Sequence, residues 1–435
     1  MIRKFVLVYV GLWIFIYALD ALLPAESIFS HRLEVIFLNG VYVLISSLVA
    51  IILSNTLFNG TSTNHIKLRI EGIGINLLMK WLISISLIGA VCFFYDKVFV
   101  QGIDYTQGLA SGRYQLQANR EGASGISSIA SAIGYIFGAF SFFLYALTFT
   151  FFEKITSRTR IFGFLVSVIT IAVISFLTGG RTSILLLFGI STGCIIIRKL
   201  LDLKWVPFNK IQMSLATAFI FGGLLYLIFV FQSRADANNK LAHIYTIGMI
   251  SHMNGNITQS FNDLSEISDD ISSYVYFGTL VGVYATHSNW TFEGVLELTE
   301  RKGNAMFLAW RNLLAKFGLM RPSKEWEFYG IFISWPGGVY HDYGHIGLLI
   351  FAIIHGILIT LTKQMIYQYG INVLTMGFFM LISIITFSSP FILASDVLMF
   401  PTLTISIPLI FILSRFIGHQ QLLKFEIMPF KSNFI

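Results

Sequence analysis

Charged residues are scarce in this chain of 435 residues. Asp, Glu, Lys and Arg make up 12% of it, whereas 55% of the residues are hydrophobic. A soluble domain usually contains about 25% charged residues, because its surface must be hydrated. The composition therefore excludes an ordinary soluble protein and indicates an integral membrane protein.

Cysteine is almost absent, and so are the short motifs of several enzyme classes. The two cysteines, Cys92 and Cys194, both fall in long apolar runs, so no disulfide framework is expected. The chain contains no Asp-x-Asp pair, His-Glu-x-x-His, Walker loop or Gly-x-Ser-x-Gly. The sequence thus predicts no metal site, no cofactor and no serine hydrolase. No clustered basic face with interleaved aromatic residues occurs, so no nucleic-acid partner is predicted either.

What the chain has in abundance is apolar runs long enough to cross a bilayer, which takes about 20 residues in a helix. The runs are continuous rather than alternating, which argues against a transmembrane β-barrel. The first run follows Arg3 and Lys4 but is interpreted as a retained helix rather than a signal peptide. The predicted fold is an all-α polytopic membrane bundle of about ten helices: Phe5–Leu23, Leu33–Leu53, Ile73–Tyr95, Ile126–Phe152, Ile161–Leu177, Ser183–Ile197, Ile211–Phe231, Ile346–Thr362, Val373–Leu393 and Val397–Ser414.

Lysines and arginines concentrate in the short loops on one side of these spans. The positive-inside rule then places both termini in the cytoplasm. Three regions are predicted: residues 1–231 with seven spans and an outer loop at 96–125, an extracytoplasmic loop subdomain at 232–345, and residues 346–435 with three spans and a cytoplasmic tail. The long loop covers about a quarter of the chain, so function is expected there.

Two apolar segments lie inside the long loop. Tyr274–Ala285 is too short to span and predicts a re-entrant or interfacial segment. Asn304–Met320 has Phe307, Trp310, Leu314 and Phe317 at helical spacing, with basic residues away from that stripe. This pattern fits a helix lying on anionic headgroups, and it fits equally a helix packed on the core of the subdomain.

Four arginines are predicted at the outer ends of spans: Arg113, Arg120, Arg181 and Arg234. Arg181, in "TGGRTS", lies in a short turn before a helix N-terminus, which itself favours anions. Arginine binds phosphate through paired donors, so the four are candidates for binding a lipid diphosphate headgroup. The alternative is that each one reaches an ordinary phospholipid phosphate at the interface.

The segment "WPGGVYHDYGHIG" at the start of the eighth predicted span is the other candidate site. We expect Pro336, Gly337 and Gly338 to form a turn that delivers the residues after it to the outer end of the span. His341 and Asp342 are the candidates for proton transfer, because imidazole titrates near pH 6.5 and a neighbouring carboxylate can orient it. By contrast, His355, within the span, is expected to be a hydrogen-bonded interior residue.

These features resemble the O-antigen polymerase family, the Wzy-type oligosaccharide repeat unit polymerases. The resemblance covers the whole chain: the number of spans, a large outer loop before the last spans, "GGRTS" at an outer turn, and "YHDYGHIG" at a helix entrance. It implies a GT-C-like glycosyltransferase bundle in a bacterial inner membrane, with its active face in the periplasm. Arg181 matches the family's arginine turn, and Asp342 with Gly344 matches its signature.

The implied activity joins undecaprenyl-diphosphate-linked oligosaccharides into O-antigen or a related surface polysaccharide, with inversion at the anomeric carbon. Arg181 and the other arginines would stabilise the departing diphosphate, and His341 or Asp342 would accept the acceptor's proton. The aromatic rings of Trp335, Tyr340 and Tyr343 are candidates for contacts with sugars. A chain-length regulator and a flippase are the implied protein partners.

Two other functions fit the same sequence. A ligase would transfer finished glycan from the same lipid carrier to lipid A or to a protein, by similar donor chemistry. A flippase or exporter of lipid-linked sugars belongs to a different class, and transporters of that kind commonly show two related halves with functional groups at mid-membrane.

Overall fold

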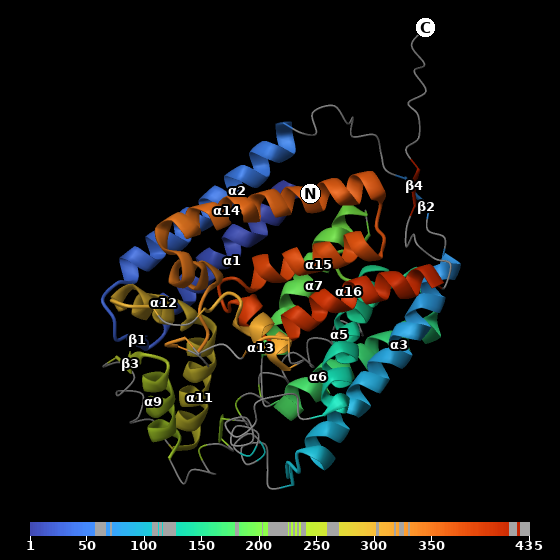
Figure 1. Ribbon diagram of the computed structural model, residues 1–435. Helices are drawn as coiled ribbons and strands as arrows, with labels where there is room; N and C mark the ends of the chain where they lie inside the picture. Colours follow the sequence, from blue (N-terminus) through green and yellow to red (C-terminus); the bar gives the residue numbers. More distant parts are fainter. Residues whose placement is uncertain are drawn as a thin grey trace.

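The computed structural model is a helical bundle with a smaller group of helices at one end (Figure 1). It describes residues 1–56, 67–69, 72–106, 112, 115, 128–178, 182–201, 203–207, 225, 228, 231–232, 235, 241–258, 269–301, 304–316, 319–321, 326–328, 331–416 and 424–426. Arg113, Arg120, Arg181 and Arg234 lie outside these residues, and so does most of the predicted seventh span.

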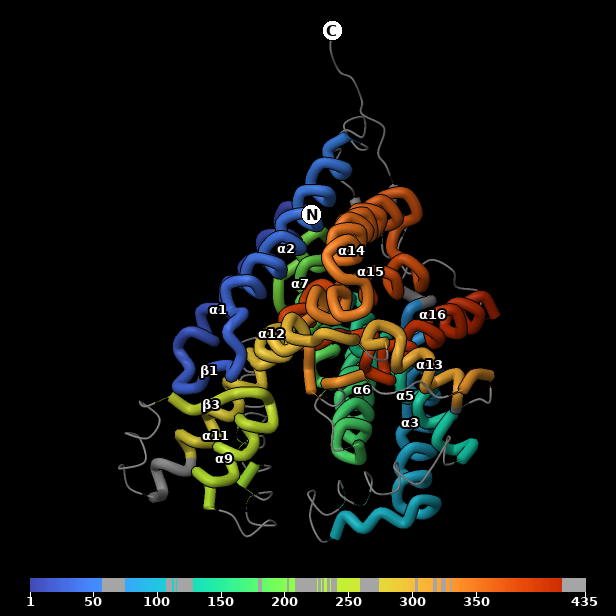
Figure 2. Tube along the Cα trace, turned by 60° about the vertical axis from the view of Figure 1, so that its left-hand side comes forward, coloured from blue at the N-terminus to red at the C-terminus, as the bar shows by residue number. Residues whose placement is uncertain are grey.

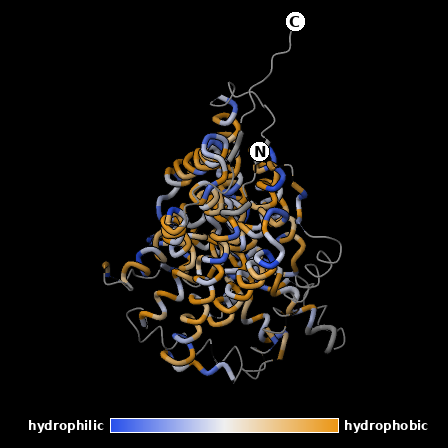
Figure 3. The backbone as a smooth tube through the Cα atoms, turned by 90° about the vertical axis from the view of Figure 1, so that its right-hand side faces the viewer, coloured by the Kyte–Doolittle hydropathy of each residue, from blue (hydrophilic) through white to orange (hydrophobic). Residues whose placement is uncertain are grey.

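Eight described helices are long and apolar enough to cross a membrane, which makes the protein a multi-pass membrane protein. Hydrophobic residues occur along most of the bundle, as the hydropathy colouring of the backbone shows (Figure 3). A ninth helix, α15 (Val373–Ser388), is apolar but shorter. The eight helices are α1 (Ile2–Leu22), α2 (Arg32–Thr56), α3 (Gly72–Tyr95) with its extension η1, α5 (Ile129–Thr150), α6 (Ser157–Thr178), α7 (Thr182–Leu200), α14 (Trp335–Tyr369) and α16 (Met399–Phe416).

The remaining described elements are short. They are β1 (Ala25–Ser27), β2 (Lys67–Arg69), η1 (Asp96–Val100), α9 (Ala242–His252), β3 (Gly255–Ile257), α11 (Asp269–Thr286), α12 (Ser288–Glu297), α13 (Leu308–Lys316), η3 (Ala394–Asp396) and β4 (Lys424–Glu426). Strands β1 and β3 pair antiparallel, with Ala25 opposite Ile257, and β2 pairs antiparallel with β4. The β1–β3 ladder lies beside α9 and α11 in both views (Figures 1 and 2).

Helix α5 forms the centre of one half of the bundle, where it packs against α3, α6, α7 and α16. In the other half, α2 packs along α14. Their backbones approach closely at Gly356, where an added Cβ would lie 2.5 Å from the carbonyl oxygen of Ser46. Small residues allow such an approach between membrane helices.

His355 lies next to this contact and is buried. Its ring forms hydrogen bonds with Tyr42 Oη at 3.3 Å and with Thr386 Oγ1 at 2.9 Å. This confirms that His355 is a hydrogen-bonded interior residue.

The predicted third span ends at Tyr95, where α3 ends, and the chain continues through the π-helical turn η1, whose charges are satisfied locally. Asp96 pairs with Lys97 at 3.2 Å and accepts hydrogen bonds from Gln101 and Ser128. The apolar segment Tyr274–Ala285 belongs to a longer helix than the sequence indicated, because it lies within the 18 residues of α11, which packs on α1 and α9.

Helix α12 is buried along nearly its whole length, between α2, α11, α14 and β1. Glu293 on this helix is 1% exposed, and within the described residues its Oε2 has no hydrogen-bond partner. Burial is the main cause that raises the pKa of Glu293 to about 7; the nearby charge of Asp20 acts in the same direction, and Ser27 and Arg32 oppose it. The folded protein therefore favours the neutral acid.

A pH-dependent stability follows for Glu293. Because its pKa is raised on folding, its stabilising contribution is fully present below about pH 4.5 and is lost as pH rises towards 7. We expect Glu293→Gln to remove this loss of stability. Between pH 5 and pH 8, the melting temperature of the variant should therefore rise relative to that of the wild type. Thermal unfolding of both proteins in detergent over that pH range measures this difference. Glu297→Gln, on the same helix but with a 46% exposed side chain, is the control. Parallel pH profiles for wild type and Glu293→Gln would contradict the assignment.

Candidate functional site

The start of α14 is helical rather than a turn. The helix begins at Trp335, with Ser334 as its N-cap and the Ser334 hydroxyl accepting the N–H of Gly337 at 3.3 Å. Pro336 stands in the first helical turn, where its missing N–H costs nothing. The predicted turn at Pro336, Gly337 and Gly338 is therefore wrong, because the serine cap and the proline together start a helix.

The helix is interrupted at Gly344, which has φ 64° and ψ −158°. This backbone conformation is essentially restricted to glycine. The interruption divides α14 into a short first segment, from Trp335 to Tyr343, and a long second segment. The first segment carries the candidate proton-transfer residues, and it is packed against α12 through the rings of Phe292 and Tyr340, whose centroids lie 5.4 Å apart.

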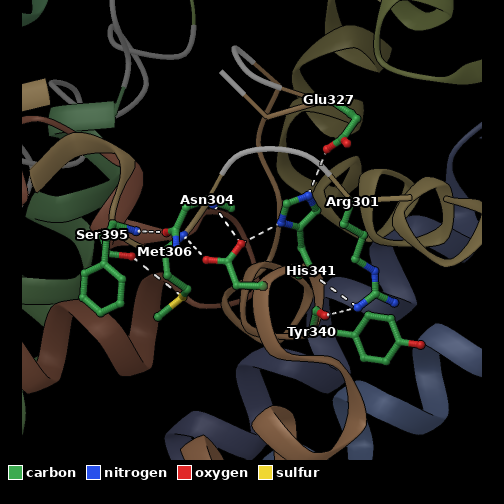
Figure 4. A network of polar contacts seen from close by, with 10 residues as sticks. Arg301, Asn304, Met306, Glu327, Tyr340, His341 and Ser395 are labelled. Atoms are coloured by element: carbon green, nitrogen blue, oxygen red, sulfur yellow. Dashed lines mark hydrogen bonds and ion pairs between the residues drawn. The ribbon is translucent and has the colours of Figure 1, made fainter. Parts of the chain in front are cut away.

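His341 lies between two carboxylates (Figure 4). Its Nδ1 is 2.6 Å from Asp342 Oδ1, and its Nε2 is 3.0 Å from Glu327 Oε2. The side chains of His341 and Asp342 are 1% and 2% exposed, whereas that of Glu327 is 20% exposed. The three residues form a carboxylate–imidazole–carboxylate chain, here called the relay, with one end accessible.

Asp342 is held by the backbone that leads into α13. Its Oδ1 accepts the N–H of Ala305 at 2.9 Å and its Oδ2 accepts the N–H of Met306 at 2.8 Å. The N–H of Phe307 is satisfied by Asn304 Oδ1 at 2.8 Å, so the turn before α13 is itself ordered by hydrogen bonds. These two amide donors fix the orientation of the Asp342 carboxyl group towards His341.

Arg301 satisfies the carbonyls at the end of the first segment of α14. Its Nη1 donates to the carbonyl of Tyr340 at 2.8 Å and to that of His341 at 3.4 Å, and its guanidinium lies 4.6 Å from the centroid of the Tyr340 ring. A cation at the C-terminal end of a helix interacts favourably with the helix dipole. Arg301 is exposed and, in Figure 4, lies with Glu327 around His341. A fixed positive charge is thus placed at the carbonyl end of the segment that carries His341.

A further carboxyl group, Asp396 in η3, lies near the relay. Its Oδ1 is buried without a hydrogen-bond partner among the described residues. Burial, with a smaller effect of the charge of Asp342, raises the pKa of Asp396 to about 8. The folded protein therefore favours the neutral form of Asp396.

The relay can move a proton between Glu327 and the interior. An imidazole between two carboxylates favours its protonated form, since each opposite charge stabilises the imidazolium. Both ring nitrogens of His341 are engaged, so a substrate reaches the relay through Glu327 rather than through the imidazole itself. Sequence reasoning missed Glu327 and Arg301, because neither stands at a fixed spacing from the His-Asp pair.

The other predicted site residues fall into two groups. The four arginines predicted to bind diphosphate are not described by the structure, as noted above. Of the predicted sugar-binding aromatic residues, Trp335 and Tyr340 are 7% and 6% exposed, while Tyr343 is 41% exposed and stacks on Phe351 with centroids 5.3 Å apart. Among these three rings, Tyr343 is therefore the one open to solvent or substrate.

Comparisons with known proteins do not extend this picture. No protein-family model matches the chain, and no curated protein or solved structure matches it significantly. Within the described residues, no group of three or more His, Cys, Asp or Glu side chains is arranged to hold a metal ion.

The interruption of α14 can be tested at Gly344. Alanine there must adopt a conformation that costs about 1–3 kcal/mol, so Gly344→Ala is expected to lower stability by that order. Chemical or thermal unfolding in nanodiscs measures the loss. The matched control is Gly278→Ala in α11, where an added Cβ meets nothing within 4 Å and the loss should be absent. Equal stability of Gly344→Ala and wild type would mean that α14 is not broken there.

Proposed function

We propose that this protein is a membrane-embedded glycosyltransferase that joins lipid-diphosphate-linked oligosaccharides into a longer glycan. The observation that carries the proposal is the relay, in which a buried His341–Asp342 pair ends in the partly exposed carboxylate of Glu327, on a helical segment whose carbonyl end binds the cation of Arg301. A base and a cation held by the same short segment suit a reaction in which a hydroxyl attacks and an anionic group leaves. The multi-pass architecture suits a substrate that is anchored in lipid.

In this mechanism the acceptor hydroxyl oxygen forms a bond to the anomeric carbon of the donor glycan. The bond between that carbon and the diphosphate oxygen breaks, and its electron pair leaves with the lipid diphosphate. Glu327 accepts the hydroxyl proton, and His341 with Asp342 balances the charge change behind it. Attack opposite the leaving group gives inversion. Arg181 and the other predicted arginines, together with Arg301, would stabilise the diphosphate. The site faces the outer side of a bacterial inner membrane, with both termini in the cytoplasm.

An exporter of lipid-linked sugars is the second candidate, because one observation favours it. His355 lies inside the bundle, 3% exposed and hydrogen-bonded to Tyr42 and Thr386 on two other helices. Ionisable residues within membrane bundles mark proton pathways in transporters.

Incubation of the purified protein with a defined undecaprenyl-diphosphate oligosaccharide distinguishes the candidate functions. A ladder of lipid-linked products indicates the polymerase, transfer only to an added lipid A or protein acceptor indicates a ligase, and movement across a vesicle without new bonds indicates the exporter.

The role of Glu327 predicts a specific loss. Glu327→Gln keeps the size of the side chain but removes the accepting carboxylate, so ladder formation should slow by about 10²–10⁴-fold, the usual contribution of a general base. The rate is measured with purified protein and matched membrane abundance. Glu300→Gln, at an exposed position on the same connecting segment, should retain the wild-type rate. A fully active Glu327→Gln variant would remove Glu327 from the mechanism.

The role of Arg181 is tested in the same way. Donors aimed at charge that develops in the transition state contribute about 10²–10³-fold each, so Arg181→Ala should shorten the surface glycan sharply. Arg181→Lys should rescue poorly, because an ammonium lacks the paired donors. Glycan chain length is resolved by electrophoresis after membrane abundance has been checked. Normal long chains from a well-expressed Arg181→Ala protein would exclude the role.

A further inference from the structure

Helix α13 has two different apolar faces. Leu308, Ala309 and Leu313 are 1%, 4% and 3% exposed, and the helix packs against η3 and α16. The buried residues are not those of the predicted stripe, and they pack on η3 and α16 rather than on a core of the loop subdomain. This leaves the opposite face to be explained.

That opposite face is apolar and exposed. Phe307, directly before α13, is 44% exposed, and Trp310 and Leu314 on the same side are half-buried. The chain after α13 adds Leu319, 70% exposed, and Met320, 46% exposed. A cluster of large apolar side chains that remains open to the surroundings usually marks an interaction surface.

The position of α13 indicates what this surface meets. The helix packs against η3 and against α16, the candidate span that begins at Met399, three residues after η3. Its open face therefore lies near the end at which this candidate span begins, which is the level where the span would leave the bilayer. Figure 1 shows α13 at this end of α16.

Charge points to the same partner. Arg321 is exposed just after α13, next to Leu319 and Met320, whereas Arg311 on α13 is half-buried, with its Nε inside the protein. Basic residues beside large apolar side chains are typical of helices that lie in the interface of an anionic bilayer.

We propose that α13 and the turn that follows it lie in the headgroup layer of an anionic bilayer, with Phe307, Leu319 and Met320 inserted at the acyl boundary. The position of α13 on the bilayer also affects the relay. The amides of Ala305 and Met306, which bind Asp342, immediately precede this helix. A shift of α13 away from the membrane would pull these donors from the carboxylate. The lipid contact itself does not depend on the glycosyltransferase proposal.

A depth measurement tests the lipid contact. Met320→Cys in a Cys92→Ser, Cys194→Ala background is labelled with bimane and placed in phosphatidylcholine nanodiscs, with and without phosphatidylglycerol. We expect a blue-shifted emission that brominated phospholipids quench strongly and aqueous iodide quenches weakly. Asn256→Cys, at an exposed position of β3, should show the reverse. Quenching at position 320 by iodide alone would overturn the proposal, whatever the enzyme does.

Two further variants separate the outcomes. Replacing Arg311 and Arg321 by Gln should abolish the increase in lipid quenching that phosphatidylglycerol produces, while melting behaviour in detergent stays unchanged. Cross-linking between two copies through Met320→Cys, without lipid quenching, would instead assign the surface to a dimer and overturn the lipid contact. Quenching that is the same with and without phosphatidylglycerol would overturn the anionic part of the proposal.

Discussion

A charge that is buried away from water must find its partners inside the protein, and this constraint shapes the molecule more than any other. Arg198 shows it on α7, where the side chain is fully buried. Its guanidinium donates to the carbonyls of Phe149 and Thr150 at 3.0 and 2.9 Å, at the end of α5, and also pairs with Glu153. One arginine thereby satisfies carbonyls that the end of a helix leaves open and ties two spans together.

The relay obeys the same constraint in a different geometry. Asp342 is buried, so its carboxylate needs two amide donors from the turn before α13 in addition to His341. Those contacts connect residues 305–306 with α14, and they are available because the loop residues fold back onto the first turns of that helix. Arg301 completes the arrangement from the carbonyl end of the same segment. The polar groups of the site are therefore held by backbone atoms, which leaves Glu327 as the partly exposed side chain of the relay.

The bundle could be predicted from the sequence to a large extent, because a membrane span needs only a long apolar run and each run carries that information locally. Eight described helices meet this requirement, and α15 corresponds to a ninth predicted span. An error arose where local chemistry decides the structure, at Pro336, which starts a helix rather than a turn because Ser334 caps it. The site was predicted in part: His341 and Asp342 do meet, but Glu327 stands 14 residues before His341, and such a contact depends on tertiary folding.

The length of α14 explains why its helix must break. The helix covers 35 residues, or about 52 Å at 1.5 Å per residue, whereas the hydrocarbon core is about 30 Å thick. The segment after Gly344 contains roughly 25 residues and spans the core with some tilt. The first segment is therefore left beyond the hydrocarbon, and the glycine lets it change direction and pack against α12 instead of projecting into water. The same break exposes the carbonyls of Tyr340 and His341, which Arg301 then satisfies. Thus an excess of helix length over bilayer thickness, resolved at one glycine, lets the first segment turn aside and carry an imidazole that lies between two carboxylates, of which Glu327 is the partly exposed one.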